Sequence, residues 1–297
     1  MNKLGTTWAK HKSKYLMIAP FGIIFFAFTI LPVFSSMILS LTSFNMLEMP
    51  KFVGFENYIN LFVNDDIFLI ALKNTLFFAV VTGPVSYFMC FIFAWLINGL
   101  PVKVRAFMTL IFYAPSISGN AFLIWKLIFS SDSRGFANSI LSDLGFTSGA
   151  VLWFDNAAYV MPILILVQLW LSLGVSFLAF IAGLKNVDKS LYEAGAIDGI
   201  KTRWQELWFI TLPSMKPQLL FGAVIQITTS FSVAAISTEL AGFPSVEYAG
   251  HTILTHLQDY GTIRMEMGYA SAIATLLFLI MVVTNLLIQK LIRRVGK

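Results

Sequence analysis

Residues 185–216 read KNVDKSLYEAGAIDGIKTRWQELWFITLPSMK, a polar segment that lies between two long apolar runs. The first half of this segment carries the punctuation of a short helix. Ser190 and Glu193 have the spacing of a capping box, and Gly199 stands where a glycine commonly ends a helix. This pattern predicts a helix that begins at Ser190 and ends before Gly199.

The second half of the segment repeats the pattern. Thr202 and Gln205 again have capping-box spacing, and a helix that begins there is expected to end near Pro213. Two short helices with caps form a compact helix-turn-helix, and we call residues 185–216 the knob. A membrane protein with such a knob on its surface is expected to dock it onto a partner. A loop that only sets topology is the alternative.

The composition of the chain is that of a membrane protein. Hydrophobic residues make up 58% of its 297 residues and charged residues only 12%, whereas soluble domains have about 25% charged residues. A helix that spans a bilayer needs about 20 apolar residues, and lipid leaves every backbone group to be paired within its own segment. The predicted spans are Tyr15–Leu41, Ala71–Ile97, Phe107–Phe129, Tyr159–Gly183, Pro217–Leu240 and Met267–Lys290.

The distribution of basic residues predicts the orientation. Fifteen of the 20 Lys and Arg residues fall in the N-terminal tail, the second loop, the knob and the C-terminal tail. Loops rich in Lys and Arg stay in the cytoplasm, so both termini and the knob are predicted to be cytoplasmic. This sidedness accounts for the net charge of +5 without a nucleic-acid partner. The predicted parts are a tail (1–14), the first span (15–41), a core (71–290) and a second tail (291–297).

The knob resembles the EAA loop of permease subunits from bacterial ABC importers. That motif reads Glu-Ala-Ala, three residues, Gly, about nine residues and then Ile-x-Leu-Pro, and the matching residues here are Glu193, Ala194, Gly199, Ile210, Leu212 and Pro213. Two features depart from it. Gly195 replaces the second Ala, and ten residues rather than nine separate Gly199 from Ile210, which predicts a slightly different turn.

Three further stretches resemble the oligosaccharide permeases related to the maltose system. Residues 52–58 (FVGFENY, followed by Asn74-Thr75) precede the second span, 178–184 (LAFIAGL) lead into the knob, and 267–272 (MGYASA) open the last span. The resemblance covers residues 15–290. Residues 237–244 (STELAGFP) depart from the Leu-Thr-x-Gly-Gly-Pro of the family, so an external gate or receptor contact is expected to differ there.

The resemblance implies an all-α type I importer permease with six transmembrane helices and a cytoplasmic coupling helix between the fourth and fifth spans. It implies a second, different permease subunit, two cytoplasmic ATPase subunits, an extracellular solute-binding protein and a glycan substrate. It places the chain in the lipid of a bacterial cell membrane. Coupling to the ATPase would fall on Tyr192, Glu193, Ala194, Gly195, Asp198, Gly199 and Pro213.

Catalytic and metal-binding patterns are missing from the sequence. No Walker A motif occurs, so ATP and Mg²⁺ are expected on a partner ATPase and no cofactor is expected on this chain. His251 and His256 are five residues apart in a predicted external loop, which is poor spacing for two zinc ligands on one helix face. The spans hold no catalytic triad or carboxylate pair, which disfavours an enzyme.

Polar side chains within the spans outline a candidate substrate path. Gln168 and Ser172 are one helical turn apart, and a polar break surrounds Asn120. The path residues are Asn120, Gln168, Trp170, Ser172, Gln226, Thr229 and Ser230. Such a path is polar but uncharged, which suits a neutral polyhydroxy solute whose rings stack on Trp. The same residues can instead join helices by hydrogen bonds.

Two other functions remain open on the sequence. The same kind of importer could carry glycerol phosphate or another polyol-like solute, although no span has a central Lys or Arg to meet a phosphate. A stand-alone ion-coupled carrier would use intramembrane carboxylates, which the span centres lack. Neither the carrier nor a membrane enzyme accounts for the knob. The single cysteine, Cys90, lies in the second span, where packing is its expected role.

Overall fold

The structure is a computed structural model that describes residues 3–147 and 149–292, with side chains from residue 12 onward. The predicted tail 291–297 therefore lies outside the described residues from 293 onward. The described part is helical apart from one short antiparallel pair, β1 (Thr42–Ser43) and β2 (Lys51–Phe52). It divides into two compact units, residues 1–64 with 257–276 and residues 65–256 with 277–297, which we describe one at a time.

The first unit holds one long apolar helix and a small cap. Its elements are α1 (Lys3–Phe25), the π-helical turn η1 (Phe26–Ile30), α2 (Leu31–Leu39), β1, β2, α3 (Glu56–Val63), η4 (Asp259–Ile263) and the start of α16 (Met267–Ile292). Buried Asn57 donates to the backbone oxygens of Ser40 and Thr42, at 2.8 and 2.9 Å. Tyr58 donates to Ser40 Oγ at 2.7 Å. The Asn-Tyr pair of the FVGFENY stretch thus fastens α3 to the end of α2.

In the same unit, the glycine of the MGYASA stretch, Gly268, is required by a close approach of two backbone segments. A Cβ at this position would overlap Thr42 O and lie 2.9 Å from Phe44 N, both of which are backbone atoms that cannot swing away. Glycine instead lets its own N–H donate to Phe44 O at 2.9 Å. Only a residue without a side chain permits this approach.

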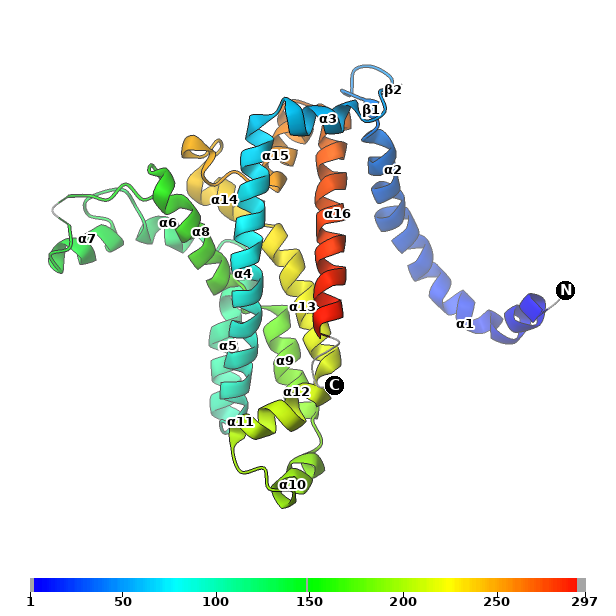
Figure 1. Cartoon of the computed structure of the whole chain (residues 1–297), viewed down its shortest axis with the longest axis vertical. Coiled ribbons are helices and arrows are strands. Elements are labelled where there is room, and N and C mark those ends of the chain that lie inside the picture. Colours follow the sequence, from blue (N-terminus) through cyan, green and yellow to red (C-terminus); the bar gives the residue numbers. More distant parts are fainter. Residues whose placement is uncertain (1–2, 148, 293–297) are drawn as a thin grey trace. The chain divides into compact units, whose positions relative to one another are not determined.

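The second unit carries the remaining helices (Figure 1). They are α4 (Asp66–Asn98), α5 (Val102–Ile117), α6 (Leu123–Ile128), α7 (Phe136–Asp143), α8 (Ala157–Leu171), α9 (Val175–Asn186), α10 (Lys189–Ile197), α11 (Arg203–Glu206), η2 (Leu207–Thr211), α12 (Leu212–Ser214), α13 (Lys216–Phe231), α14 (Ala234–Ala241) and η3 (Val246–Tyr248). The helix α15 (Ile253–Gln258) begins here, and α16 ends here.

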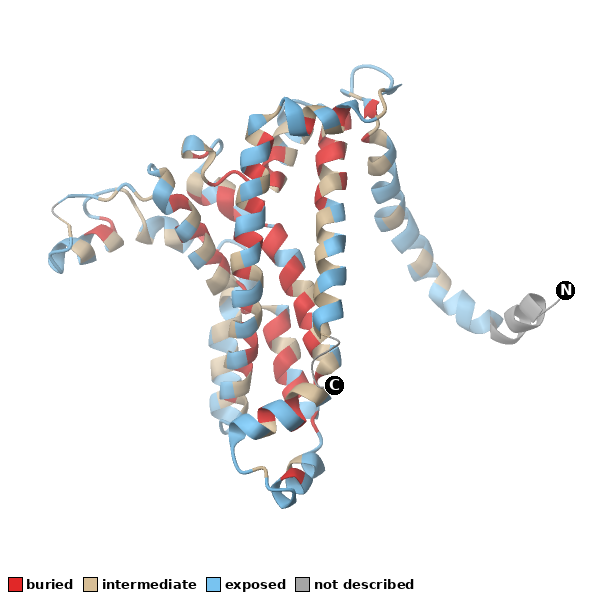
Figure 2. Cartoon of the chain, viewed as in Figure 1, coloured by how far each residue is buried: buried red, intermediate tan, exposed pale blue. Residues whose placement is uncertain are grey.

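The core of the second unit forms where α4, α9 and α13 pack against one another. The Phe180 side chain is fully buried and meets the rings of Tyr87 and Phe91 edge-on, at 5.5 and 5.6 Å between ring centroids. Gly222 of α13 lies against the same ring. Small residues at helix contacts let membrane helices approach closely. Figure 2 shows the resulting concentration of buried residues along α9 and α13.

Within residues 3–147 and 149–292, five helical stretches are long and apolar enough to cross a membrane, and they match five of the six predicted spans. They are Lys12–Leu39, Asp66–Asn98, Ala157–Asn186, Lys216–Ala241 and Met267–Ile292. The third predicted span, Phe107–Phe129, is not one continuous helix. It ends at Ile117 and resumes at Leu123, because the polar run Ser118-Gly119-Asn120 favours turns over helix and Ser118 adopts an extended conformation.

Candidate functional site

The N-cap of α10, the first helix of the knob, lies two residues earlier than predicted. Asp188, not Ser190, is its N-cap, and the Asp188 carboxylate accepts the backbone N–H of Ser190 at 3.0 Å. This hydrogen bond holds the pKa of Asp188 below its usual value. The predicted capping box of Ser190 and Glu193 is therefore wrong. Asp and Ser are both favoured at N-cap positions. Asp188 is the N-cap here because the helix already begins at Lys189.

The end of α10 is as predicted. Gly199 has a φ of +91°, in the left-handed region that costs a side chain-bearing residue free energy, and Ile200 N–H returns to Gly195 O at 2.9 Å. Gly195 itself faces the second half of the knob. A Cβ there would lie 2.7 Å from Ile210 Cδ1 and 3.1 Å from Ile200 Cδ1. The first departure from the EAA motif thus lets two isoleucines pack against α10.

The second departure, the extra residue, coincides with a π-helical turn. The predicted capping box of Thr202 and Gln205 is confirmed and opens α11. The chain then widens into η2, in which Leu212 N–H bonds to Leu207 O, five residues back. A π turn holds one more residue than an α turn, so it accommodates the insertion before Leu212 and Pro213. The helical run ends at Ser214, one residue after the predicted end at Pro213.

The seven predicted coupling residues divide between the two sides of the knob. Glu193, Ala194, Asp198 and Gly199 are exposed on α10 and its exit turn. Tyr192, Gly195 and Pro213 face inward, and the Tyr192 hydroxyl lies 2.9 Å from Thr211 Oγ1. Sequence reasoning missed Ile197, which is 87% exposed beside Glu193 and Asp198. Its position in the polar loop was visible in the sequence, and it adds an apolar side chain to the exposed side of α10.

The knob is attached to the end of α4 by two contacts. The rings of Trp204 and Trp95 lie 5.2 Å apart. The Arg203 guanidinium lies against Gly99, where a Cβ would be 2.7 Å from Nη2. Trp95, Gly99 and Arg203 border a small polar cavity of about 130 Å³, whose other lining residues are Asn98, Leu184, Tyr192, Glu206 and Thr211. A displacement of the knob is therefore expected to move α4.

A second, polar cavity of about 220 Å³ lies where α8 gives way to α9. It brings together four of the predicted path residues, Gln168, Ser172, Gln226 and Thr229. The rest of the lining is uncharged, and it consists of Tyr113, Ser116, Leu171, Gly174, Val175, Ser176 and Ile225. We call this cavity the polar pocket. Tyr113 and Ser116 of α5 were not among the predicted path residues, although Ser116 belongs to the polar break noticed around Asn120.

The hydrogen bonds of the polar pocket show which of its residues join helices and which have side chains that remain available to a ligand. Gln226 Nε2 donates to Ser172 O and to Cys90 Sγ, at 3.2 Å each, so its amide nitrogen ties α13 to α4 and to the end of α8. Thr229 donates to Gln226 O and Oε1. Within the described part of the chain, the Gln168 amide has no protein partner, and its side chain is available to a solute.

The other three path residues lie elsewhere. The Ser230 hydroxyl donates to Ile227 O at 2.8 Å and faces Gly83, so Ser230 serves helix packing. Asn120 is exposed on the interruption after α5. Trp170 meets Trp125 edge-on at 5.5 Å between ring centroids. Helical periodicity alone does not specify whether a polar residue faces a cavity or a neighbouring helix.

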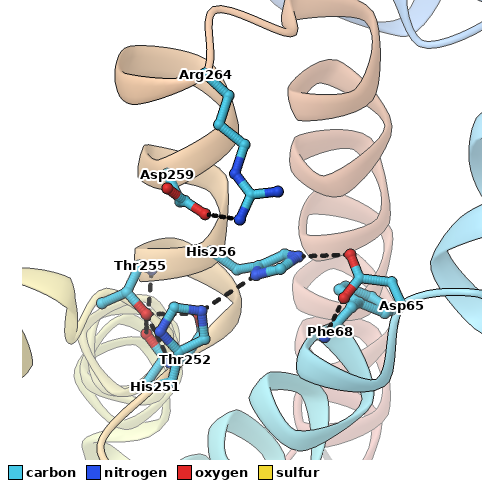
Figure 3. A network of polar contacts seen from close by, with 8 residues as sticks. All are labelled: Asp65, Phe68, His251, Thr252, Thr255, His256, Asp259 and Arg264. Carbon is cyan, nitrogen blue, oxygen red and sulfur yellow. Dashed lines mark hydrogen bonds and ion pairs between the residues drawn. The ribbon is translucent and has the colours of Figure 1, made fainter. Parts of the chain in front are cut away.

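His251 and His256 are buried rather than placed in an open loop, and they form a polar chain with Asp65 (Figure 3). His251 Nε2 lies 3.1 Å from His256 Nδ1, and His256 Nε2 lies 3.0 Å from Asp65 Oδ2. Asp65 Oδ1 caps α4 by accepting the N–H of Phe68 at 2.8 Å. The histidines thus fasten α15 to the start of α4. Among the described residues, no group of three or more His, Cys, Asp or Glu side chains is arranged to hold a metal ion.

The Asn74-Thr75 pair fastens the neighbouring loop to the same helix. Asn74 Nδ2 donates to the backbone oxygens of Tyr248 and His251, at 3.0 and 2.9 Å. Thr75 Oγ1 accepts the N–H of Ile253 at 2.8 Å. The residues that directly follow the divergent stretch 237–244 are therefore anchored to α4.

Comparison with known proteins gives matches over nearly the whole chain. Residues 75–297 match the family model described as binding-protein-dependent transport system inner membrane component. The chain is 34% identical to the arabinooligosaccharides transport system permease protein AraP of Bacillus subtilis, over 96% of this chain and 90% of AraP. It is 31% identical to the probable ABC transporter permease YesP of the same organism, over 93% and 89% of the two chains.

A more distant relative and a solved structure extend the comparison. The lactose transport system permease protein LacF of Rhizobium radiobacter is 28% identical, over 92% of this chain and 91% of LacF. A chain from the crystal structure of a bacterial ABC transporter that imports the acidic polysaccharide alginate matches with a TM-score of 0.79 at 24% identity, over the full length of both chains. That likeness shows a shared fold.

Proposed function

Because this chain belongs to the binding-protein-dependent transport system inner membrane components, we propose that it translocates an oligosaccharide or related glycan as one permease subunit of an ATP-driven importer. Its relatives AraP and LacF serve an arabinooligosaccharide and a lactose transport system. The observation that carries the substrate class is the polar pocket, whose 220 Å³ are lined by hydroxyl, amide and apolar groups without a charge.

The pocket residues suit a neutral polyhydroxy solute. Gln168 offers an amide that both donates and accepts, Tyr113 and Ser116 offer hydroxyls, and the Tyr113 ring supplies an aromatic face. A phosphate-bearing solute needs a cation or several backbone donors, and the lining has no Lys or Arg. This favours a glycan over glycerol phosphate. A stand-alone ion-coupled carrier is not favoured, because the family works with a binding protein.

The knob would couple transport to ATP hydrolysis on partner subunits. In this proposal the knob and both termini lie in the cytoplasm, and the exposed face of α10 docks onto an ATPase subunit with Ile197 at its centre. Glu193 there meets a basic residue of the ATPase. Closure of the two ATPase subunits then displaces the knob, and the contacts of Arg203 and Trp204 pass the displacement to α4. The result is a rigid-body switch between two access states.

The remaining partners complete the importer. A second, different permease subunit shares the membrane, and an extracellular solute-binding protein delivers the glycan. Alternating access requires a solute site that opens first to one side and then to the other. The polar pocket lies at the break between α8 and α9, where a change in helix direction can open or close it.

Two adjacent threonines of α13 provide the test. Thr229 lines the polar pocket, whereas Thr228 does not, and the Thr228 hydroxyl bonds within the helix to Val224 O. In vesicles that contain the complete complex, Thr229→Ala and Gln168→Ala are expected to raise the KM for glycan uptake several-fold. Thr228→Ala is expected to leave it unchanged. Equal effects of Thr228→Ala and Thr229→Ala, or uptake of a phosphorylated solute in preference to every glycan, would overturn the proposal.

A further inference from the structure

The helix α7 presents apolar side chains outward on a segment that projects from the second unit. Phe136, Ile140 and Leu144 recur every four residues and therefore share one side of the helix. Phe136 is 67% exposed, and Phe146 just beyond the helix is 75% exposed. Ile140 and Leu144 are exposed as well. In water such a side would normally turn inward, so its direction requires an explanation.

The inward side of α7 is instead held by a polar residue. Asn138 is 2% exposed and makes a set of hydrogen bonds that closes the segment. Its Nδ2 donates to the backbone oxygens of Ser130, Asp132 and Val151, at 3.2, 2.9 and 3.2 Å. Its Oδ1 accepts Val151 N–H at 3.1 Å and Trp153 Nε1–H at 3.0 Å. These hydrogen bonds fix the side of α7 that faces inward, so the apolar side faces outward in a well-defined local structure.

A third side of α7 is polar and exposed. At 100° per residue, Ser139 and Asp143 lie next to the apolar side, and exposed Ser142 lies between Ser139 and Asn138. The helix thus has one side toward its own chain, one apolar side and one polar side. An amphipathic helix that lies along a membrane surface has this division, with its apolar side in the lipid and its polar side in water.

The neighbourhood of α7 has the features of a membrane–water interface. Trp153, which donates to Asn138, also contacts Phe129 and Tyr159, at 5.2 and 5.5 Å between ring centroids. Phe129 in turn stacks on Trp125. Trp and Tyr gather where spans meet the interface. This cluster lies at the junction of α6 and α8 with the α7 segment.

The level of α7 along the second unit agrees with this location. Figure 1 shows α7 beside the bundle, at a level between the two ends of α4. The 33 residues of α4 make a helix of about 50 Å, longer than the hydrocarbon core of about 30 Å. One or both ends of α4 therefore extend beyond the hydrocarbon core, so a helix beside α4 and level with a point between its ends can lie at the interface.

We propose that α7 is an interfacial helix that lies in the membrane surface at the end where α4 begins, with Phe136, Ile140, Leu144 and Phe146 in the lipid. A binding protein that comes and goes would leave these side chains in water for part of each cycle, which disfavours it as the occupant. The only charge within α7 is Asp143, so contact with acyl chains, not attraction to anionic headgroups, holds the helix there. This inference does not depend on the transported solute.

Spin labels on two sides of α7 test the proposal in the assembled transporter in lipid nanodiscs. Ile140→Cys and Leu144→Cys probe the apolar side, and Ser139→Cys and Ser142→Cys are the matched controls on the polar side. Native Cys90 is buried, and the unmodified chain measures its background labelling. Power saturation should give oxygen accessibility above that to water-soluble nickel chelate at residues 140 and 144, and the reverse at 139 and 142.

Two results would overturn the inference. High accessibility to the nickel chelate at all four positions would place both sides of α7 in water. Low accessibility to both reagents at residues 140 and 144 would mean that a protein partner covers the apolar side. A second variant pair gives an independent reading with the label at Leu144→Cys: Ile140→Asp should raise its nickel accessibility severalfold, whereas Ser142→Asp should not. Nickel accessibility that stays constant in both would also contradict the proposal. The oxygen signal should not change with the fraction of anionic lipid.

Discussion

Replacement of Gly222 with alanine is expected to destabilise the packing of α9 on α13. A Cβ at this position would lie 2.6 Å from Phe180 Cε1 and closer still to Cζ. Carbon atoms pack best at about 3.5–4.0 Å, so the overlap is about 1 Å. The Phe180 ring has no free direction, because its side chain is fully buried and the rings of Tyr87 and Phe91 hold it edge-on.

The magnitude follows from two opposing effects. Overpacking in a well-packed interior costs about 1–3 kcal/mol, and replacement of glycine by alanine inside a helix returns about 1 kcal/mol. The overlap at Gly222 involves a rigid ring, which places the overpacking cost at the upper end of its range. The net loss in free energy of unfolding is then about 2 kcal/mol, or about a 30-fold fall in the ratio of folded to unfolded chains.

Denaturant titration of the purified protein in detergent, followed by tryptophan fluorescence, measures this loss. Gly22→Ala is the control, since a Cβ at Gly22 meets nothing within 4 Å. Phe180→Leu combined with Gly222→Ala should recover part of the stability lost by Gly222→Ala alone. Equal stability of Gly222→Ala and the parent chain, or no recovery in the double variant, would refute the packing argument.

Three further predictions concern the knob and the start of α4. Gly195→Ala should weaken co-purification of the ATPase, and added Ile210→Val, which removes the clashing methyl, should restore it; failure of Ile210→Val to restore it would contradict the packing account. The backbone N–H of Ser190 lowers the pKa of Asp188 in the folded protein. The ionised carboxylate therefore contributes its full stability above the unfolded pKa of about 3.9. This contribution is lost as the pH falls through the lower folded pKa. The protection of the Ser190 N–H, relative to its intrinsic exchange rate at each pH, should therefore fall on acidification in the parent chain but not in Asp188→Asn, and an equal fall in both would speak against the cap. Asp65→Ala removes an N-cap and a partner of His256 and should cost about 1–3 kcal/mol, whereas Asp65→Asn should cost less in thermal unfolding; equal losses would argue against the capping role.

Local punctuation made the knob largely predictable. The glycine at 199 and the capping box at Thr202 are features of a few adjacent residues, and the structure has both. The start of α10 was misplaced because Asp188 and Ser190 are both good caps, and the choice depends on the backbone of Lys189. The π turn of η2 was foreshadowed only by a length difference of one residue, which does not specify where the turn widens.

The polar pocket was predictable in part, for a different reason. Helical periodicity places Gln168 and Ser172 on one side of α8, but whether that side meets a cavity depends on helices far away in sequence. Ser230 follows Thr229 directly and bonds within its own helix instead. The polar break around Asn120 was visible in the sequence, but the apolar residues on both sides favoured one continuous span over two helices, α5 and α6.

The most direct test of coupling through the knob is the ATPase activity of the purified complex in vesicles, measured with and without Glu193→Arg. A panel of glycans, each with its binding protein, supplies the stimulus. The account predicts glycan-stimulated hydrolysis in the parent complex, and loss of both stimulation and ATPase co-purification in Glu193→Arg. A parent chain that purifies without any ATPase and moves solute alone would contradict it.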